Sequence, residues 1–284
     1  MKVLLIGGHG LLGTAFRSAV PSTVALVAPT RTELDLTDDI AVAKALDETR
    51  PAWVINCAAY TAVDAAEESE GAAARLNSEA VGALGAAAAE RGLRVLQPST
   101  DYVFDGASTR PYREDDAPRP LSTYARTKWD GEQRLRQSGA RALIVRSSWL
   151  FGRGGKNFPS SMWTHAQARK AVAVVSDQTG APTSAADLAG WCWELIARDE
   201  QGLVHATNSG SATWFEVARA VYAAAGWPEG VTATTTAAYA ANALRPRYSV
   251  LDCSRLDERI GTRRRDWRAA LDEFLGALRA ERAA

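Results

Sequence analysis

Tyr124 and Lys128 are the residues whose types and spacing best suit chemistry, in the stretch Tyr-Ala-Arg-Thr-Lys. On a helix this spacing places both side chains on one face, one turn apart. A free phenol titrates near pH ~10, and a neighbouring cation lowers that pKa because it favours the phenolate. The pair is therefore suited to moving a proton between a hydroxyl and a carbonyl. The same spacing occurs on ordinary exposed helix faces, so the elements on either side must show whether the pair is catalytic.

A glycine-rich turn follows the first apolar segment. Residues 3–6 form a short apolar run, typical of a buried parallel strand, and Gly7, Gly10 and Gly13 follow at intervals of three. Such a turn lets a pyrophosphate reach the start of the next helix, expected at Leu11 and Leu12, where free N–H groups favour an anion. Since the turn lies directly after the first strand, the pattern predicts a dinucleotide site.

The end of the second expected strand, residues 23–28, bears on which dinucleotide is bound. An acid that would hold a ribose 2′-hydroxyl is missing there, and the sequence reads Pro-Thr-Arg up to Arg31. A guanidinium can pair with a 2′-phosphate, which favours NADPH. If Arg31 is an ordinary surface residue, NADH is the alternative.

Thr100 follows the fourth expected strand and offers a hydroxyl that can donate to a carbonyl oxygen. The distance to Tyr124 allows the two side chains to converge, and Ser122 is placed to cap the Tyr124 helix. Between them, residues 110–120 are rich in Pro, Asp, Glu and Arg, which predicts an exposed loop. A long alanine-rich stretch, residues 64–91, predicts a continuous packing helix.

Strands and helices alternate through the first half, with further strands expected over residues 53–57, 94–97 and 142–146. This order predicts an α/β fold, a Rossmann-like doubly wound parallel sheet. We expect residues 1–152 to form the NAD(P)-binding domain. Residues 153–284 are expected to form mainly a smaller C-terminal α/β substrate-binding region, with some segments returning to the Rossmann sheet.

Several stretches together resemble the dTDP-4-dehydrorhamnose reductase family, which belongs to the extended-type short-chain dehydrogenases/reductases. The most specific are Ser-Thr-Asp-Tyr-Val-Phe at 99–104 and Asp-Gln-Thr-Gly-Ala-Pro-Thr at 177–183. The others are the Tyr124/Lys128 pair, Arg-Ser-Ser-Trp at 146–149, Arg245-Pro246, and the segment at 58–64. The resemblance covers the chain nearly end to end and in order.

The resemblance implies NAD(P)H-dependent reduction of the 4-keto group of a dTDP-4-keto-6-deoxy sugar, above all dTDP-4-dehydro-L-rhamnose. Tyr124 would donate the proton, Lys128 would hold the nicotinamide ribose, and Thr100 would bond the reacting oxygen. Asp101 and Trp149 would contact the sugar nucleotide, with Trp149 offering a flat face to the sugar. Further substrate contacts are expected from Asn157 and from Arg245, which could instead form a surface salt bridge. The remaining expected cofactor contacts are Gly10, Leu11, Leu12, Asp35, Leu36, Ala58, Ala59, Tyr60 and Thr61.

Three alternatives stay open. A fourth, a dehydratase of this fold, is argued against, because by resemblance such enzymes carry a glutamate after the aspartate, where this chain has Tyr102. An epimerase would use the same Tyr and Lys without net NADPH consumption. A reductase of a different dTDP-4-keto sugar, such as a dihydrostreptose synthase, is harder to separate. The last is a non-catalytic regulatory NADP-binding protein of the same fold.

Composition limits the partners and the location. The 33 basic and 33 acidic residues cancel, which argues against a nucleic-acid partner. No stretch is apolar enough to span a bilayer, and the three cysteines show no zinc or disulfide spacing. We expect a cytoplasmic protein without a metal site. Some family members dimerise around Mg²⁺ through an acid on the first helix. Residues 14–17, Thr-Ala-Phe-Arg, contain none, so a monomer or weak homodimer is expected.

Overall fold

The fold is built on one parallel sheet of six strands in the order β10-β5-β4-β3-β1-β2. The computed structural model describes residues 1–283, with side chains through residue 281. Apolar runs form the strands because both faces of the sheet are covered. The strands are β1 (Lys2–Ile6), β2 (Ala25–Val27), β3 (Trp53–Asn56), β4 (Arg94–Thr100), β5 (Arg141–Ser147) and β10 (Gly202–His205). The predicted Rossmann-like sheet is confirmed.

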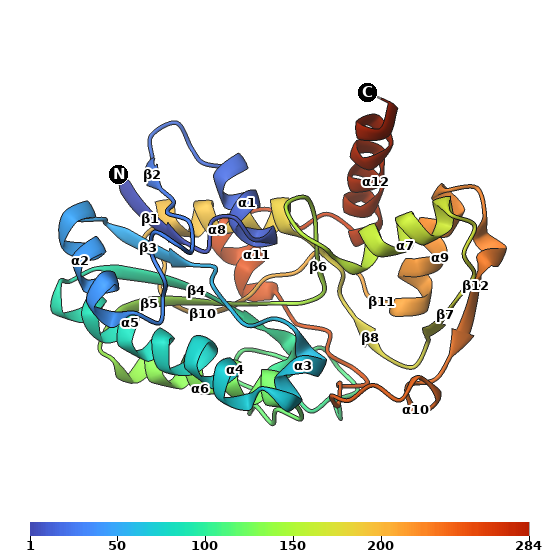
Figure 1. Cartoon of the computed structure of the whole chain (residues 1–284), viewed down its shortest axis with the longest axis horizontal. Coiled ribbons are helices and arrows are strands. Elements are labelled where there is room, and N and C mark those ends of the chain that lie inside the picture. The colour runs from blue at the N-terminus through green and yellow to red at the C-terminus, as the bar shows by residue number, and fades with distance from the viewer. Residues whose placement is uncertain (284) are drawn as a thin grey trace.

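Helices cover both faces of the sheet, as Figure 1 shows. One core cluster packs the sheet against three helices, α1 (Leu11–Ser18), α8 (Ala185–Ala197) and α11 (Ser254–Ile260). A second cluster packs the other face against α2 (Asp39–Thr49), α5 (Ala80–Glu90) and α6 (Thr123–Gln137). Because α8, β10 and α11 follow residue 152 in sequence, the second half of the chain completes both the sheet and its covering layer.

The long helix predicted over residues 64–91 is wrong in detail, because the segment is broken. It consists of α3 (Val63–Glu68), α4 (Glu70–Ala74), a π-helical turn (Arg75–Glu79) and α5. Alanine-rich composition predicts helix but does not reveal where the hydrogen-bond ladder changes. The π-helical turn packs against α6, the helix that carries Tyr124 and Lys128.

The smaller C-terminal region has its own core of aromatic and apolar side chains, among them Trp163, Tyr222 and Trp267. Its elements are α7 (Phe158–Gln167), α9 (Trp214–Ala224), α10 (Thr236–Tyr239), α12 (Trp267–Ala283), β7 (Val172–Val175) and β12 (Val231–Thr234). Two short pairs, β6 (Leu150–Phe151) with β9 (Thr183–Ser184) and β8 (Thr179–Gly180) with β11 (Ala212–Thr213), complete it. Single 3₁₀ turns occupy Asp101–Val103 and Pro228–Gly230. Figure 1 shows this region beside the carboxyl edge of the sheet.

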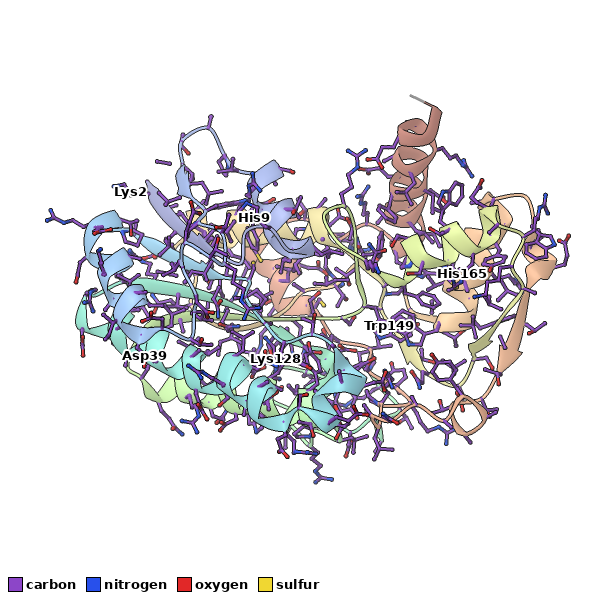
Figure 2. The ribbon with its side chains drawn as sticks, in the orientation of Figure 1. Lys2, His9, Asp39, Lys128, Trp149 and His165 are labelled. Atoms are coloured by element: carbon purple, nitrogen blue, oxygen red, sulfur yellow. The ribbon has the colours of Figure 1, made fainter. Side chains whose placement is uncertain are left out.

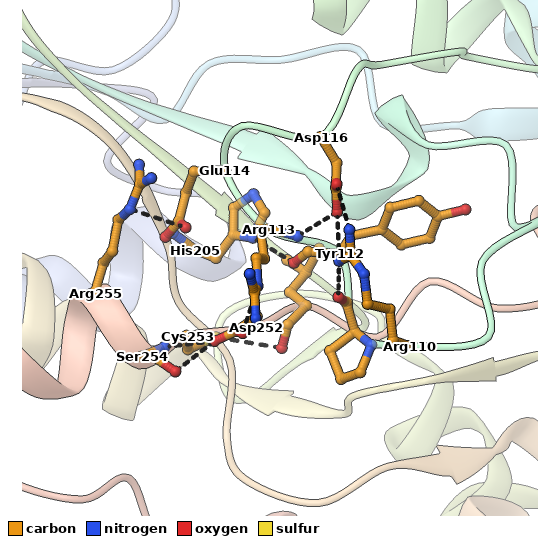
Figure 3. A network of polar contacts seen from close by, with 12 residues as sticks. Arg110, Tyr112, Arg113, Glu114, Asp116, His205, Asp252, Cys253, Ser254 and Arg255 are labelled. Atoms are coloured by element: carbon orange, nitrogen blue, oxygen red, sulfur yellow. Dashed lines mark hydrogen bonds and ion pairs between the residues drawn. The ribbon is translucent and has the colours of Figure 1, made fainter.

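The segment before α6, predicted as an exposed loop, is instead pinned along part of its length (Figure 3). Tyr112 is buried and exchanges backbone hydrogen bonds with Val250 and Asp252. Glu114 accepts from the backbone N–H of His205 at 3.0 Å and pairs with Arg255. Composition predicted a polar loop but not its partners, which lie more than 90 residues away. These contacts fix the segment to β10 and to the stretch around Val250.

Within residues 1–283, no helix combines the length and the apolarity that crossing a bilayer requires.

Candidate active site

A cleft of about 550 Å³ opens at the carboxyl ends of the parallel strands. Its walls come from the β1–α1 turn, the ends of β3, β4 and β5, helix α6 and the C-terminal region. In Figure 2, Lys128 lies in the sheet-bearing half and Trp149 lies where the two halves meet. Predicted site residues that line the cleft are Gly10, Leu11, Leu12, Ala59, Thr61, Thr100, Asp101, Tyr124, Lys128, Trp149, Asn157 and Arg245.

The glycine turn is shaped to admit a phosphate group. Gly7 has a φ of 74°, and a Cβ there would lie 2.5 Å from the backbone nitrogen of Ala58. A Cβ on Gly13 would overlap the carbonyl oxygen of Gly7, so strand, turn and helix can approach closely only with glycine. Gly10 precedes α1 without a side-chain cap, which leaves N–H groups of the first turn for an anion. These residues fit a dinucleotide pyrophosphate.

Asn77 organises the neighbouring wall and was not expected at the site. Its side-chain oxygen accepts from the Tyr60 backbone N–H at 2.8 Å. Its amide nitrogen donates to the Tyr60 carbonyl at 3.0 Å and to the Thr127 hydroxyl at 3.2 Å. One buried side chain in the π-helical turn thus fixes the loop containing Ala59 and Thr61 against α6. The signal available in sequence was a lone amide in an alanine-rich stretch.

Replacing Asn77 with alanine should weaken dinucleotide binding by about tenfold, because both backbone groups of Tyr60 lose buried partners. Titration of the intrinsic fluorescence with the dinucleotide would measure the change. The matched control is Asn242→Ala, which removes an amide that bonds Glu68 at the exposed surface. Unchanged affinity in a folded Asn77→Ala protein would refute this role.

Two sets of hydrogen bonds fix the first turn of α6 at the site. The Ser122 hydroxyl accepts from the Ala125 N–H at 3.3 Å, so the predicted N-cap is confirmed. Glu67 accepts from both the backbone and the hydroxyl of Thr123, each at 2.8 Å. Tyr124 is therefore presented by a fixed first turn, and its ring packs edge-on against Tyr102 with centroids 6.3 Å apart.

The pKa of Tyr124 shifts in the direction opposite to the sequence prediction. Burial raises it to about 12, the negative charge of Asp101 adds to the rise, and the Thr100 hydroxyl opposes it. Lys128 is not among the groups that lower this pKa, and its Nζ donates to the Pro98 carbonyl oxygen at 2.8 Å. The phenol consequently holds its proton at neutral pH.

Lys128 is buried beside the same strand end. Burial lowers its pKa to about 8, while the neighbouring Glu132 and Cys57 raise it. A pKa of about 8 keeps most of the ammonium protonated at pH 7. The side chain can therefore act as a cationic hydrogen-bond donor inside the cleft.

A buried ion pair lies one turn beyond Lys128 and was also missed. Glu132 and Arg146 are each 1% exposed and form two hydrogen bonds, of 2.9 and 2.7 Å. Ser99 donates to the same carboxylate, and the guanidinium lies between the rings of Phe104 and Trp129. The pair ties α6 to both β4 and β5, which fixes Lys128 relative to Thr100.

Thr100 ends β4, and Asp101 begins the 3₁₀ turn that follows it. The Thr100 hydroxyl donates to Asp101 Oδ1 at 3.2 Å and accepts from the Tyr102 N–H at 3.1 Å. Burial raises the pKa of Asp101 to about 7. The second carboxylate oxygen, Oδ2, is buried without a hydrogen-bond partner. Such an atom at a cleft wall is available to a ligand hydroxyl.

Trp149 lines the cleft, and one face of its ring is covered by another side chain. Trp214, the first residue of α9, stacks on it with centroids 3.6 Å apart and planes 9° from parallel. A Cβ on Gly180 would lie 2.5 Å from Trp149 Cε2, with no Trp214 atom among its three nearest neighbours. Gly180 therefore packs closely against the indole. The indole N–H of Trp149 is buried without a partner, so its polar edge is the part available to a ligand.

Asn157 and Arg245 reach the cleft while holding other groups. The Asn157 side chain caps α7 through the Ser160 N–H at 3.0 Å, and its amide donates to the Gly152 carbonyl at 2.7 Å. Arg245 forms a two-bond ion pair with Asp64, at 3.1 and 2.6 Å. The salt-bridge alternative for Arg245 is thus present, between the C-terminal region and α3.

The adenosine-side residues lie away from the cleft lining. Arg31 has 85% of its side chain exposed and lies 3.7 Å from Asp35. Asp35 accepts from the backbone and hydroxyl of Thr37, and Leu36 is buried in the core. Lining residues that the sequence prediction lacked are Asn56, Cys57, Val63, Pro98, Ser99, Tyr102, Ser147, Ser148, Leu150, Lys156 and Trp214. Several of these are small residues whose types carry no distinctive signal.

Comparison with known proteins agrees with this geometry. Residues 1–280 match the family model described as RmlD substrate binding domain. The dTDP-4-dehydrorhamnose reductase of Streptomyces griseus is 42% identical, over 97% of this chain and 93% of its own. A probable dTDP-4,6-dihydroxy-2-methyloxan-3-one 4-ketoreductase of Streptomyces antibioticus is also 42% identical, over 99% and 97%.

A solved structure shows the same fold. The dTDP-4-dehydrorhamnose reductase of Bacillus anthracis, in complex with NADP, superposes with a TM-score of 0.93 at 32% identity, covering 96% of this chain and 98% of its own. The matches span the whole site, from the glycine turn to Arg245. The chain belongs to the RmlD family of dTDP-4-dehydrorhamnose reductases.

Proposed function

We propose that this protein is an NADPH-dependent reductase of the 4-keto group of a dTDP-4-keto-6-deoxy sugar. The observation that carries the proposal is the meeting of Thr100, Tyr124 and Lys128 in one cleft, next to a glycine turn shaped for a pyrophosphate. The relatives named as reductases of such sugars, and the relative solved with NADP, support the substrate class and the cofactor.

The cofactor would be held by groups along the strand ends. The Gly10 N–H is bonded to the Gly7 carbonyl, so the N–H groups of Leu11 and Leu12 would bind the pyrophosphate beside the Gly10 backbone, and the Lys128 ammonium would bind the nicotinamide ribose. When bound, the reduced nicotinamide supplies a hydride to a carbonyl carbon. Arg31 is exposed at the end of β2 and would meet a 2′-phosphate, which is why NADPH is proposed over NADH.

The protein's own residues handle the carbonyl oxygen. The Thr100 hydroxyl would donate to this oxygen and draw negative charge toward it. The oxygen becomes an alkoxide as the carbon is reduced, and an alkoxide is a stronger base than a phenolate. Tyr124 holds its proton at neutral pH because its pKa is about 12, so it is protonated when the alkoxide forms and can transfer the proton to it.

The substrate contacts proposed are Asp101, Trp149, Asn157 and Arg245, all of which line the cleft. The buried Asp101 Oδ2 and the Trp149 indole N–H lack partners and would accept and donate, respectively, to sugar hydroxyls. Arg245, held by Asp64, would meet the diphosphate with its remaining N–H groups.

The natural sugar divides the proposal into two candidates. The first is dTDP-4-dehydro-L-rhamnose, reduced to dTDP-L-rhamnose, as the S. griseus relative's name suggests. The second is a different dTDP-4-keto sugar of a secondary-metabolite pathway. A specific observation favours keeping it, since the ketoreductase from S. antibioticus is equally similar at 42% identity.

An NADPH-oxidation assay tests the proposal. The purified protein is given dTDP-4-dehydro-L-rhamnose in one reaction and its unepimerised precursor, dTDP-4-keto-6-deoxy-D-glucose, in another. Absorbance loss at the NADPH maximum and NMR of the product would identify the preferred sugar and the configuration formed at C4. Net NADPH oxidation separates a reductase from an epimerase. Binding of NADPH without turnover of either sugar would favour the non-catalytic alternative.

We propose further that the protein is a cytoplasmic monomer or weak homodimer. Its exposed large apolar residues, such as Ile40 and Leu244, are scattered. Within residues 1–283, no three or more His, Cys, Asp or Glu side chains are grouped to hold a metal ion. Size-exclusion chromatography with light scattering would test this.

A further inference from the structure

Ser147, the last residue of β5, carries a hydroxyl that the proposed mechanism does not use. It lines the cleft, it is 4% exposed, and its Oγ has no hydrogen-bond partner. The next residue differs, since the Ser148 hydroxyl donates to the Ala181 carbonyl at 2.6 Å. Burying a hydroxyl without a partner is unfavourable, and buried polar groups in folded proteins are normally bonded. An unpaired hydroxyl at a cleft wall is therefore available to a ligand.

The position of Ser147 is set by its register with Thr100. The two residues are direct partners in the parallel pairing of β4 with β5. Neighbouring strands lie about 4.8 Å apart, so the two side chains stand next to each other. Preceding residues in the same alternation, Leu96 on β4 and Leu143 on β5, lie in one core cluster, which places Thr100 and Ser147 on the same face of the sheet.

The order of the strands indicates which part of a bound dinucleotide reaches this point. The phosphate-binding turn follows β1, the loop with Ala59 and Thr61 follows β3, and Thr100 ends β4. Strand β5 comes next in the sheet. Consider a dinucleotide whose pyrophosphate lies at α1 and whose reactive ring lies beside Thr100 and Tyr124. Such a ligand would extend along the ends of β1, β3 and β4. Ser147 lies one strand further, where the far end of a nicotinamide beside Thr100 would reach it.

We infer that the Ser147 hydroxyl binds the carboxamide of the nicotinamide ring. This inference rests on the proposed function, because it requires a nicotinamide cofactor in this cleft. A carboxamide has a carbonyl acceptor and an NH₂ donor, and a serine hydroxyl can both donate and accept. Ser147 is thereby a positioning residue, because anchoring the carboxamide limits rotation of the ring about its glycosidic bond and selects the ring face that is turned toward the carbonyl carbon.

Two ligands separate this contact from the rest of the cofactor site. NADPH carries the nicotinamide, whereas 2′-phospho-ADP-ribose has the same adenosine, phosphates and second ribose without it. Calorimetric titration of the Ser147→Ala protein should show NADPH bound about three- to tenfold more weakly than by the wild type. The affinity for 2′-phospho-ADP-ribose should be unchanged. Thr207→Val, which removes a buried hydroxyl outside the cleft, should alter neither affinity.

Thermal unfolding supplies a readout independent of turnover. Without ligand, Ser147→Ala should be at least as stable as the wild type, since the hydroxyl makes no hydrogen bond in the free protein. A clear loss of stability would assign the hydroxyl a structural role and overturn the inference. Equal NADPH affinity in both proteins, with only the KM of the sugar raised, would do the same by placing the hydroxyl at the substrate. If the wild type binds neither ligand, the proposed function itself fails.

Discussion

Replacing Tyr124 with phenylalanine is expected to lower kcat for reduction of the keto sugar by about 10²- to 10⁴-fold, the usual contribution of a positioned general acid. The variant keeps the ring and its edge-on contact with Tyr102 but has no proton to give the alkoxide. Cofactor affinity should change little, since the phosphate-binding turn and Lys128 are intact. Stopped-flow measurement of NADPH oxidation at saturating sugar, together with an NADPH titration, would separate the two effects.

The matched control is Tyr222→Phe. That hydroxyl donates to the Lys170 carbonyl at 2.7 Å in the C-terminal region, outside the cleft, so its loss should leave kcat within about twofold of the wild type. A folded Tyr124→Phe enzyme that retained more than about a tenth of wild-type kcat would show that another group delivers the proton.

Among the substitutions considered, Glu132→Ala is expected to lower the free energy of unfolding the most. In a Glu132→Ala protein the Arg146 guanidinium would stay buried between two aromatic rings without its carboxylate. Breaking a buried pair on one side costs about 3–5 kcal/mol because an uncompensated charge remains. Urea unfolding followed by circular dichroism would measure the free energy of unfolding.

A double replacement distinguishes the cost of an orphaned charge from the value of the pair. Glu132→Leu with Arg146→Met should be more stable than Glu132→Ala alone, since apolar residues of similar volume often replace a buried ion pair with little loss. Glu48→Ala, which breaks an exposed pair with Lys44, should cost less than about 1 kcal/mol. If Glu132→Ala lowered the free energy of unfolding by no more than about 1 kcal/mol, the buried-charge argument would be contradicted.

Local patterns were sufficient to predict the sheet and the part of the site that follows directly from it. A short apolar run such as Trp53–Asn56 predicts a buried strand, and glycines at 7, 10 and 13 predict a tight strand-to-helix turn. The Ser122 cap is a contact over three residues, so it too is visible in sequence. Thr100 was found for the same reason, since it follows the strand predicted over residues 94–97, which the structure extends to Thr100 itself.

Contacts between distant segments were the part that could not be predicted. Asn77 acts on Tyr60 and Thr127, and Glu132 acts on Arg146 through a pairing between α6 and β5. Trp214 reaches Trp149 from 65 residues away in sequence (214 − 149) and covers one face of its ring. The predicted direction of the Tyr124 pKa shift was wrong for a similar reason, because residue spacing reveals a nearby cation but not the burial, which raises the pKa.

The return of β10 to the sheet has a consequence for how the enzyme is made. Thr100, Tyr124 and Lys128, the residues proposed to be catalytic, are synthesised before residue 130, yet β5 has no partner on its outer side until His205 has left the ribosome. The backbone hydrogen bond of Tyr112 likewise cannot form until Val250, its partner, has been synthesised. Until then the nascent chain presents an open strand edge, the feature most prone to pairing with another chain. The residues proposed for the chemistry are thus encoded early, but the strand that covers the β5 edge is made only after residue 200.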